Sequence, residues 1–136
     1  MHPEVKKAIG LILLVLVFLL AAGILLTGCR QAAAFEGSRT SGASGFRMEY
    51  RILDREETAE LMLSEGDQIQ VSLSHTSGNV DLTVRQDQEE PVYKGTGQVN
   101  AEFILTIPKA GACQISVTGH KARGKVSFTC IPAKDL

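Results

Sequence analysis

Tryptophan is absent from this 136-residue chain, and aromatic residues make up only 5% of it. Open sugar-binding platforms and grooves for single-stranded nucleic acid depend on exposed aromatic rings, so both are disfavoured. Long runs of one charge are also missing, because 14 Lys and Arg residues are balanced by 15 Asp and Glu residues, for a net charge of −1. A nucleic-acid partner is not expected, since such a partner requires a concentrated basic surface.

A long uncharged stretch occurs near the N-terminus. Lys6 and Lys7 precede 19 residues, 8–26, that carry no charge and are mostly apolar. Positive residues followed by an apolar stretch are typical of an export leader. An uncleaved transmembrane helix is the alternative interpretation, because about 20 apolar residues span a bilayer.

The end of this stretch reads Leu26-Thr27-Gly28-Cys29. It resembles the lipobox of bacterial lipoproteins, in which a branched residue and two small residues precede a cysteine. The resemblance implies that residues 1–28 are a signal peptide and that the Cys29 thiolate, a good nucleophile, accepts a diacylglyceryl group. The mature protein is then expected on the extracytoplasmic face of a cell membrane, held there by its lipid.

The remaining chain divides at Phe46. Residues 29–45 are small and polar without a sustained period, which predicts a lipidated N-terminus and a flexible tether. From Phe46 to Leu136 the dominant period is two, with turn residues every eight to twelve positions, so the sequence predicts one antiparallel β-sandwich of about seven or eight strands. The expected strands are 46–52, 61–63, 69–73, 80–84, 91–94, 103–107, 113–119 and 124–130.

The last two expected strands form a hairpin if 120–123 is a turn. Residues whose numbers sum to 243 are then opposite each other, which pairs Val117 with Val126, Ile115 with Phe128 and Cys113 with Cys130 and places these apolar residues on one inward face. Opposed residues of an antiparallel pair are close enough for a disulfide, and export would allow the bond to persist. Two alternatives remain at this stage: two reduced cysteines buried in the core, or a metal site that includes His120.

Four segments resemble the prokaryotic pre-peptidase C-terminal domain and related jelly-roll modules: Leu63–Val71, Gly78–Arg85, Phe103–Pro108 and Gly124–Phe128. Cys113 stands where such domains usually carry an aromatic residue. The resemblance implies a jelly-roll-like sandwich that accompanies secreted enzymes as a binding or processing module and supplies no catalytic residues.

Catalytic residues are sparse after the leader. His75 and His120 are the only histidines there, both in segments with loop-like composition, and no Gly-x-Ser-x-Gly elbow precedes a predicted helix. The carboxylate pairs Glu56-Glu57 and Glu89-Glu90 are adjacent in sequence, so extended backbone directs the two members of each pair to opposite faces. No catalytic constellation is predicted.

Calcium is the one metal that the loops suggest. Asp81, Asp87, Glu89 and Glu90 lie near one another in sequence, but their spacing does not match an EF-hand loop. Acidic residues that serve solubility are the simpler interpretation, so no metal and no cofactor are predicted.

Three functions are consistent with these features. The first is a non-catalytic envelope module that binds a protein, a glycan or a wall polymer through a sheet face or loops. The second is an enzyme or enzyme subunit, which requires His75 or His120 to meet an acidic residue within hydrogen-bond distance. The third is a structural spacer. The sequence favours a binding or structural module over an enzyme.

Overall fold

The computed structural model describes residues 33–87 and 90–136, and the predicted signal peptide and Cys29 lie outside these residues. The predicted all-β, antiparallel architecture is confirmed. Among the described residues, no helix is long and apolar enough to cross a membrane. The elements are β1 (Phe35–Gly42), β2 (Gly45–Leu53), β3 (Glu56–Leu63), β4 (Gln68–Gln86), β5 (Tyr93–Gln98), β6 (Ala101–Thr106), β7 (Gly111–Ile131) and the 3₁₀ helix η1 (Ala133–Asp135).

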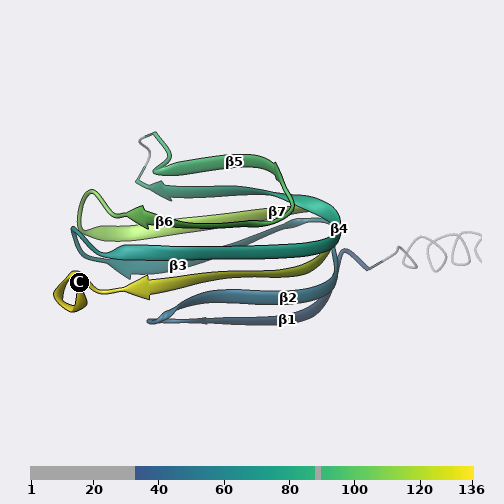
Figure 1. The fold of residues 1–136 in the computed structure, drawn as a ribbon, viewed down its shortest axis with the longest axis horizontal. Coiled ribbons are helices and arrows are strands. Elements are labelled where there is room, and N and C mark those ends of the chain that lie inside the picture. The colour runs from purple at the N-terminus through teal and green to yellow at the C-terminus, as the bar shows by residue number, and fades with distance from the viewer. Residues whose placement is uncertain (1–32, 88–89) are drawn as a thin grey trace, which may run out of the picture. The chain divides into compact units, whose positions relative to one another are not determined.

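Two long strands organise the domain. β4 has 19 residues and β7 has 21, and they pair antiparallel from Gln68 opposite Ile131 to Gln86 opposite Cys113. Both strands bend near their middle, at the same end of the domain (Figure 1). The bends divide the pairings into two layers. Layer A contains β1, β2, the second half of β7, the first half of β4 and β6, and layer B contains β3, the first half of β7, the second half of β4 and β5.

The core lies between the two layers and follows the period-two pattern of the strands. Val80, Leu82 and Val84 are each fully buried, while Asp81 and Thr83 between them are partly exposed. Alternation of this kind is what a sheet with one covered face requires. The largest buried side chains come from both layers: Phe46, Phe128, Met48, Leu53, Ile69, Leu82, Ile107 and Ile115.

Glycine permits the close approach of β4 and β7 at the bend. Gly78 has a φ of +69°, and a Cβ at this position would lie 2.2 Å from the carbonyl oxygen of Lys121. The pairing shifts register twice between His75 and Asn79, as bulges do where a strand bends. Residues 75–79 are therefore part of a bulged strand and not the loop that their composition suggested.

The predicted C-terminal hairpin is wrong. Residues 113–130 belong to one strand, β7, and do not fold back on themselves. Val117 lies opposite Leu82 of β4, whereas Val126 lies opposite Leu73. The alternation had identified the inward face correctly, since Val117 and Val126 are both buried, but it carried no information on which strand is the partner.

The structure has Cys113 and Cys130 as free thiols, so the predicted disulfide finds no support in it. They lie near the two ends of the bent strand β7, close enough for the charge of Cys130 to act on Cys113, and in the β4–β7 ladder Cys113 lies opposite Gln86 and Cys130 opposite Ile69. Both contribute to the core, Cys113 as a fully buried residue and Cys130 as a partly buried one. The structure thus corresponds to the alternative of two reduced cysteines that act as small apolar side chains.

Burial gives Cys113 a testable pH dependence. Burial, and secondarily the charge of Cys130, raises the pKa of Cys113 from 9.0 to about 11. Because the folded pKa exceeds the unfolded one, this stabilising contribution is complete below pH 9 and is lost as the pH rises to 11. We expect the free energy of unfolding to fall over that range by on the order of 2 kcal/mol more in wild type than in Cys113→Ala, measured by urea denaturation under reducing conditions.

Thiol titration of the unreduced, unfolded protein should also find reactive groups, and their absence would contradict free cysteines.

Strand β1 corrects the predicted domain boundary. Residues 35–42 form an edge strand paired with β2, although the sequence predicted a tether over 29–45. Phe35 packs against the core, but residues 37–42 are exposed, so the segment has no apolar alternation to detect. Similarly, β3 begins at Glu56, ahead of the short strand that the sequence predicted over 61–63.

Candidate functional site

The outer face of layer A is covered with hydroxyl and charged side chains. The strand register arranges them in rows across β1, β2, β7 and β4. One row contains Thr40, Arg47, Ser127 and Ser72, and the next contains Ser38, Glu49, Lys125 and Ser74. On β2, β4 and β7 these residues alternate with buried core residues, so their direction follows from the period of two, whereas Ser38 and Thr40 belong to the exposed edge strand β1.

Three hollows adjoin one another along this face, with volumes of about 700, 380 and 310 Å³. The first two share Ser38, Glu49 and Lys125, and the second and third share Thr40 and Arg47. We call the combined depression the outer groove. Its outward-facing lining comprises Glu36, Ser38, Thr40, Arg47, Glu49, Arg51, Ser72, Ser74, Thr76, Arg123, Lys125, Ser127 and Thr129.

Differences in side-chain length explain the groove. Ser72 and Ser74 on β4 and Ser127 on β7 are short, whereas Arg47 and Lys125 beside them are long. Short side chains leave the sheet surface low, and the long ones form walls. The groove thus offers hydroxyl groups on its floor and charges along its walls.

The charge of the outer groove differs from that of the whole chain. Four cationic residues and two acidic ones line it, which gives +2, whereas the chain carries −1. One acid is neutralised locally, because Glu36 forms an ion pair with Arg51. Within residues 33–87 and 90–136, Arg47, Arg123 and Lys125 form no ion pair. Three cations of the groove are therefore available to a ligand.

His120 meets an acidic residue. Its Nε2 lies 2.7 Å from Oδ2 of Asp81, and the backbone N–H of Gly97 donates to the other carboxylate oxygen at 2.8 Å. These hydrogen bonds, the one from His120 first, hold the pKa of Asp81 below its usual value. The His120 side chain is 50% exposed, so the pair lies at the surface near the bend of β7. The arrangement is a solvent-accessible histidine oriented by a carboxylate.

His75 is buried, not in a loop as expected. Its Nε2 is hydrogen-bonded to the hydroxyl of Tyr50, and its Nδ1 lies 2.7 Å from the carbonyl oxygen of Val99. The backbone N–H of His75 donates to Oδ1 of Asn100 at 3.1 Å. Burial raises the pKa of Tyr50 above its usual value, so the phenol stays protonated. Both ring nitrogens are engaged, and this histidine therefore connects β2 and β4 to the β5–β6 turn.

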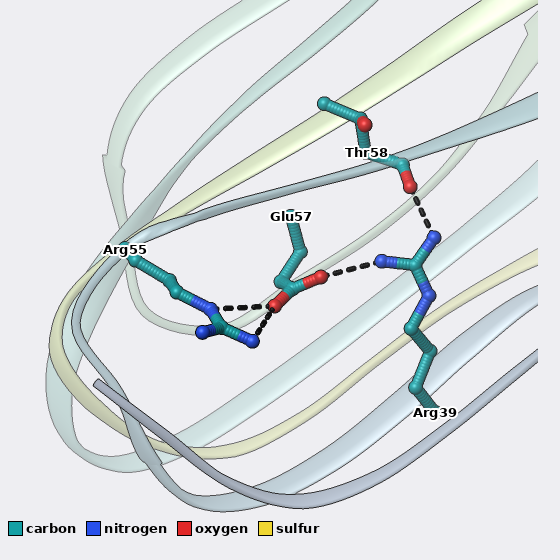
Figure 2. Close-up of polar contacts among 4 residues, drawn as sticks. All are labelled: Arg39, Arg55, Glu57 and Thr58. Atoms are coloured by element: carbon teal, nitrogen blue, oxygen red, sulfur yellow. Dashed lines mark hydrogen bonds and ion pairs between the residues drawn. The ribbon is translucent and has the colours of Figure 1, made fainter. Parts of the chain in front are cut away.

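Glu57 of β3 lies between two arginines, Arg39 and Arg55 (Figure 2). Arg39 of β1 binds it at 2.5 Å and also donates to the carbonyl oxygen of Thr58, while Arg55 binds the other carboxylate oxygen at 2.7 Å. The guanidinium of Arg39 also covers the ring of Phe46, with its Cζ 4.9 Å from the ring centroid. Because β1 belongs to layer A and β3 to layer B, this cluster ties the two layers together.

We expect Glu57→Gln to lower the free energy of unfolding by about 1–2 kcal/mol, because it leaves the two guanidinium groups without their shared carboxylate. The Glu57 side chain is only 11% exposed, so water replaces this partner poorly. Glu60→Gln on the same strand removes an exposed carboxylate and should change stability by less than about 0.5 kcal/mol. Urea denaturation of both variants at low and high salt measures the difference, and equal effects of the two substitutions would show that the cluster adds nothing.

Of the carboxylates considered for calcium, those that the structure describes do not form a common site. Asp81 binds His120, Asp87 forms an ion pair with Lys109 at 3.0 Å, and Glu89 lies outside the described residues. In the part of the chain that the structure describes, no group of three or more His, Cys, Asp or Glu side chains is placed to hold a metal ion. Glu56 is exposed and Glu57 is turned toward the arginines, so this pair points to opposite sides as predicted.

The described domain is an antiparallel β-sandwich with a polar groove on the outer face of layer A. No protein-family model matches the chain, and no curated protein matches it. Among solved structures, the chain is similar to PliG of Aeromonas hydrophila, a periplasmic inhibitor of g-type lysozyme, with a TM-score of 0.45 and 15% identity over 75% of this chain and 92% of that one.

The sequence did not point to the outer groove. Its residues come from four strands, and each one alone is an ordinary exposed polar residue. The contact between Asp81 and His120, which are 39 positions apart, was also not predicted. One feature of the sequence could have indicated the groove: serine and threonine occur at alternate positions between Gln70 and Thr76 and between Lys125 and Thr129.

Proposed function

We propose that this protein is a lipid-anchored, extracytoplasmic module of the bacterial cell envelope that binds a partner without catalysing a reaction. The lipobox-like sequence Leu26-Thr27-Gly28-Cys29 supports the anchor. The resemblance of the strand segments to pre-peptidase C-terminal domains supports a binding or processing module. The membrane is thus one partner, through Cys29, and an envelope macromolecule is the other.

The observation that carries the binding function is the outer groove. It extends along one sheet face, has hydroxyl groups on its floor and contains three cations without ion pairs among the described residues. A surface that served only solubility would need no hollow, and its exposed charges could all be paired with one another. A row of adjoining shallow hollows with available charges offers a surface on which a macromolecule can bind.

The anchor is tested by labelling the full chain with a fatty-acid analogue in a bacterial host. We expect label on wild type and none on Cys29→Ala, together with a mature mass that begins at Cys29. Unlabelled wild-type protein that retains all 136 residues would instead establish an uncleaved transmembrane segment.

Binding through the outer groove is tested by site-specific photo-cross-linking in the same cells. A photoreactive residue at Ser127, on the groove floor, should give a defined adduct, whereas one at Thr96, exposed on β5 of layer B, should not. The adduct should disappear when Arg47, Arg123 and Lys125 are all replaced by glutamine. Adducts that form equally from both positions would reject the groove as the binding surface.

A second function, an enzyme or enzyme subunit, is favoured by one observation, the 2.7 Å contact between His120 and Asp81. A carboxylate-oriented histidine can act as a general base. Hydrolysis of ester and amide model substrates by wild type, lost in His120→Ala and retained in His75→Ala, would support it. Equal background rates in all three proteins would leave binding as the function.

A further inference from the structure

We propose that the ligand of the outer groove is a linear anionic polymer of hydroxylated units that carries phosphate or carboxylate groups along its length. This inference rests on the proposed binding function and specifies its ligand. It commits to a polymer of the envelope and not to a folded protein partner.

The charges of the groove favour an anion. Arg47, Arg123 and Lys125 are exposed, and none of them forms an ion pair with another described residue. Glu49, directly opposite Lys125 in the β2–β7 ladder, is the one acid of the groove that forms no ion pair there. Arginine binds phosphate and carboxylate through parallel hydrogen bonds, and lysine binds them as a point charge.

The spacing of the cations favours a chain over a compact ion. Arg123 and Lys125 are two residues apart on β7, which corresponds to about 7 Å along a strand. Arg47 lies on the neighbouring strand opposite Ser127, one outward-facing row beyond Lys125, so its separation from Lys125 is about 8 Å. A single phosphate cannot reach all three cations, but an extended chain with an anionic group every ~7 Å can follow them along the groove.

The floor of the groove favours a hydroxylated polymer. Ser72, Ser74 and Ser127 present hydroxyl groups that both donate and accept hydrogen bonds. No aromatic side chain faces outward among the described lining residues, since Tyr50 and Phe128 are buried. A neutral sugar would therefore lack a stacking partner, and a protein would lack the apolar centre that stable protein interfaces contain.

The test is a binding titration with the full-length protein purified in a non-ionic detergent. Poly(glycerol phosphate) is the phosphate-bearing probe, polygalacturonate the carboxylate-bearing probe, dextran the neutral glycan and poly-L-glutamate the acidic peptide. We expect one or both of the first two to bind, with an affinity that falls as salt rises, and dextran not to bind. The stronger of the two identifies the anionic group.

Matched charge variants distinguish the groove from net charge. Arg47→Gln/Arg123→Gln/Lys125→Gln should weaken binding about tenfold or more, because it removes every unpaired cation of the groove. Arg85→Gln/Lys94→Gln/Lys134→Gln removes the same charge from exposed positions elsewhere and should change affinity less than about threefold. Circular dichroism confirms that both triple variants are folded.

Two results would overturn the proposal: no binding of either poly(glycerol phosphate) or polygalacturonate, whether or not poly-L-glutamate binds, or equal losses in the two triple variants. The first is separable from failure of the proposed function. If Ser127 still cross-links in cells and the groove variant abolishes the adduct, the module binds through the groove but its ligand is of another class.

Discussion

Replacing Phe128 with alanine is expected to lower the free energy of unfolding by about 3–5 kcal/mol. Phe128 is 1% exposed and stacks on Phe46, with 6.0 Å between the ring centroids. It also faces Val71 of β4 across the ladder, so its removal leaves a cavity that both neighbouring strands border. Rigid strands collapse poorly around such a cavity, which places the cost at the upper end for a core substitution.

Far-ultraviolet circular dichroism during urea denaturation measures this loss, because the chain has no tryptophan to report by fluorescence. Ile104→Ala is the control, since Ile104 is 56% exposed on β6 and its truncation should cost less than about 1 kcal/mol. A Phe128→Ala protein that is nearly as stable as the Ile104→Ala protein would mean that the two layers do not pack around this residue.

Replacing Gly78 with alanine is expected to cost about 2–4 kcal/mol, although only one methyl group is added. The backbone at Gly78 has a φ of +69°, and the new Cβ would lie 2.2 Å from the Lys121 carbonyl oxygen and 2.6 Å from that of His120. Both contacts are with backbone, so no side chain can rotate away. The bend of β4 and β7, which joins layer A to layer B, must shift to make room.

Gly42→Ala provides the comparison for this effect. A Cβ at Gly42 would meet no atom within 4 Å, so we expect a change of less than about 0.5 kcal/mol in the same denaturation experiment. Similar stabilities for the two alanine variants would show that β4 and β7 do not approach closely at the bend. A large loss at position 78 alone would confirm that the folding of one continuous sheet into two layers depends on glycine there.

Local signals in the sequence were sufficient for the fold class and for most inward-facing positions. Val80, Leu82 and Val84 alternate with polar residues, and all three are buried as that pattern predicts. Ile115 and Phe128 were also assigned to the inward face correctly, although they do not lie opposite each other. The reason is that the direction of a side chain depends on its own strand, whose period of two is visible in any single sequence.

Partners and boundaries were predicted poorly because they depend on residues far away in sequence. Gly119 and Gly124 looked like the ends of a turn, whereas they lie within β7, where backbone from other strands comes close: a Cβ at Gly119 would lie 2.4 Å from the Leu53 carbonyl oxygen. β1 is held by its pairing with β2 and by the contact of Arg39 with Glu57, neither of which leaves a local pattern in residues 35–42.

The sequence by itself determined an antiparallel β-sandwich and the faces of its strands, whereas a signal peptide over residues 1–28 followed by a lipidated Cys29 stays a prediction. Only the tertiary structure decided that β4 and β7 are continuous through the bend, that Cys113 and Cys130 are free, and that Arg47, Lys125 and Arg123 line one groove. Alternation is a property of one strand, whereas a groove arises from the register among several strands. That register is set by packing across the whole core, which no short segment of sequence contains.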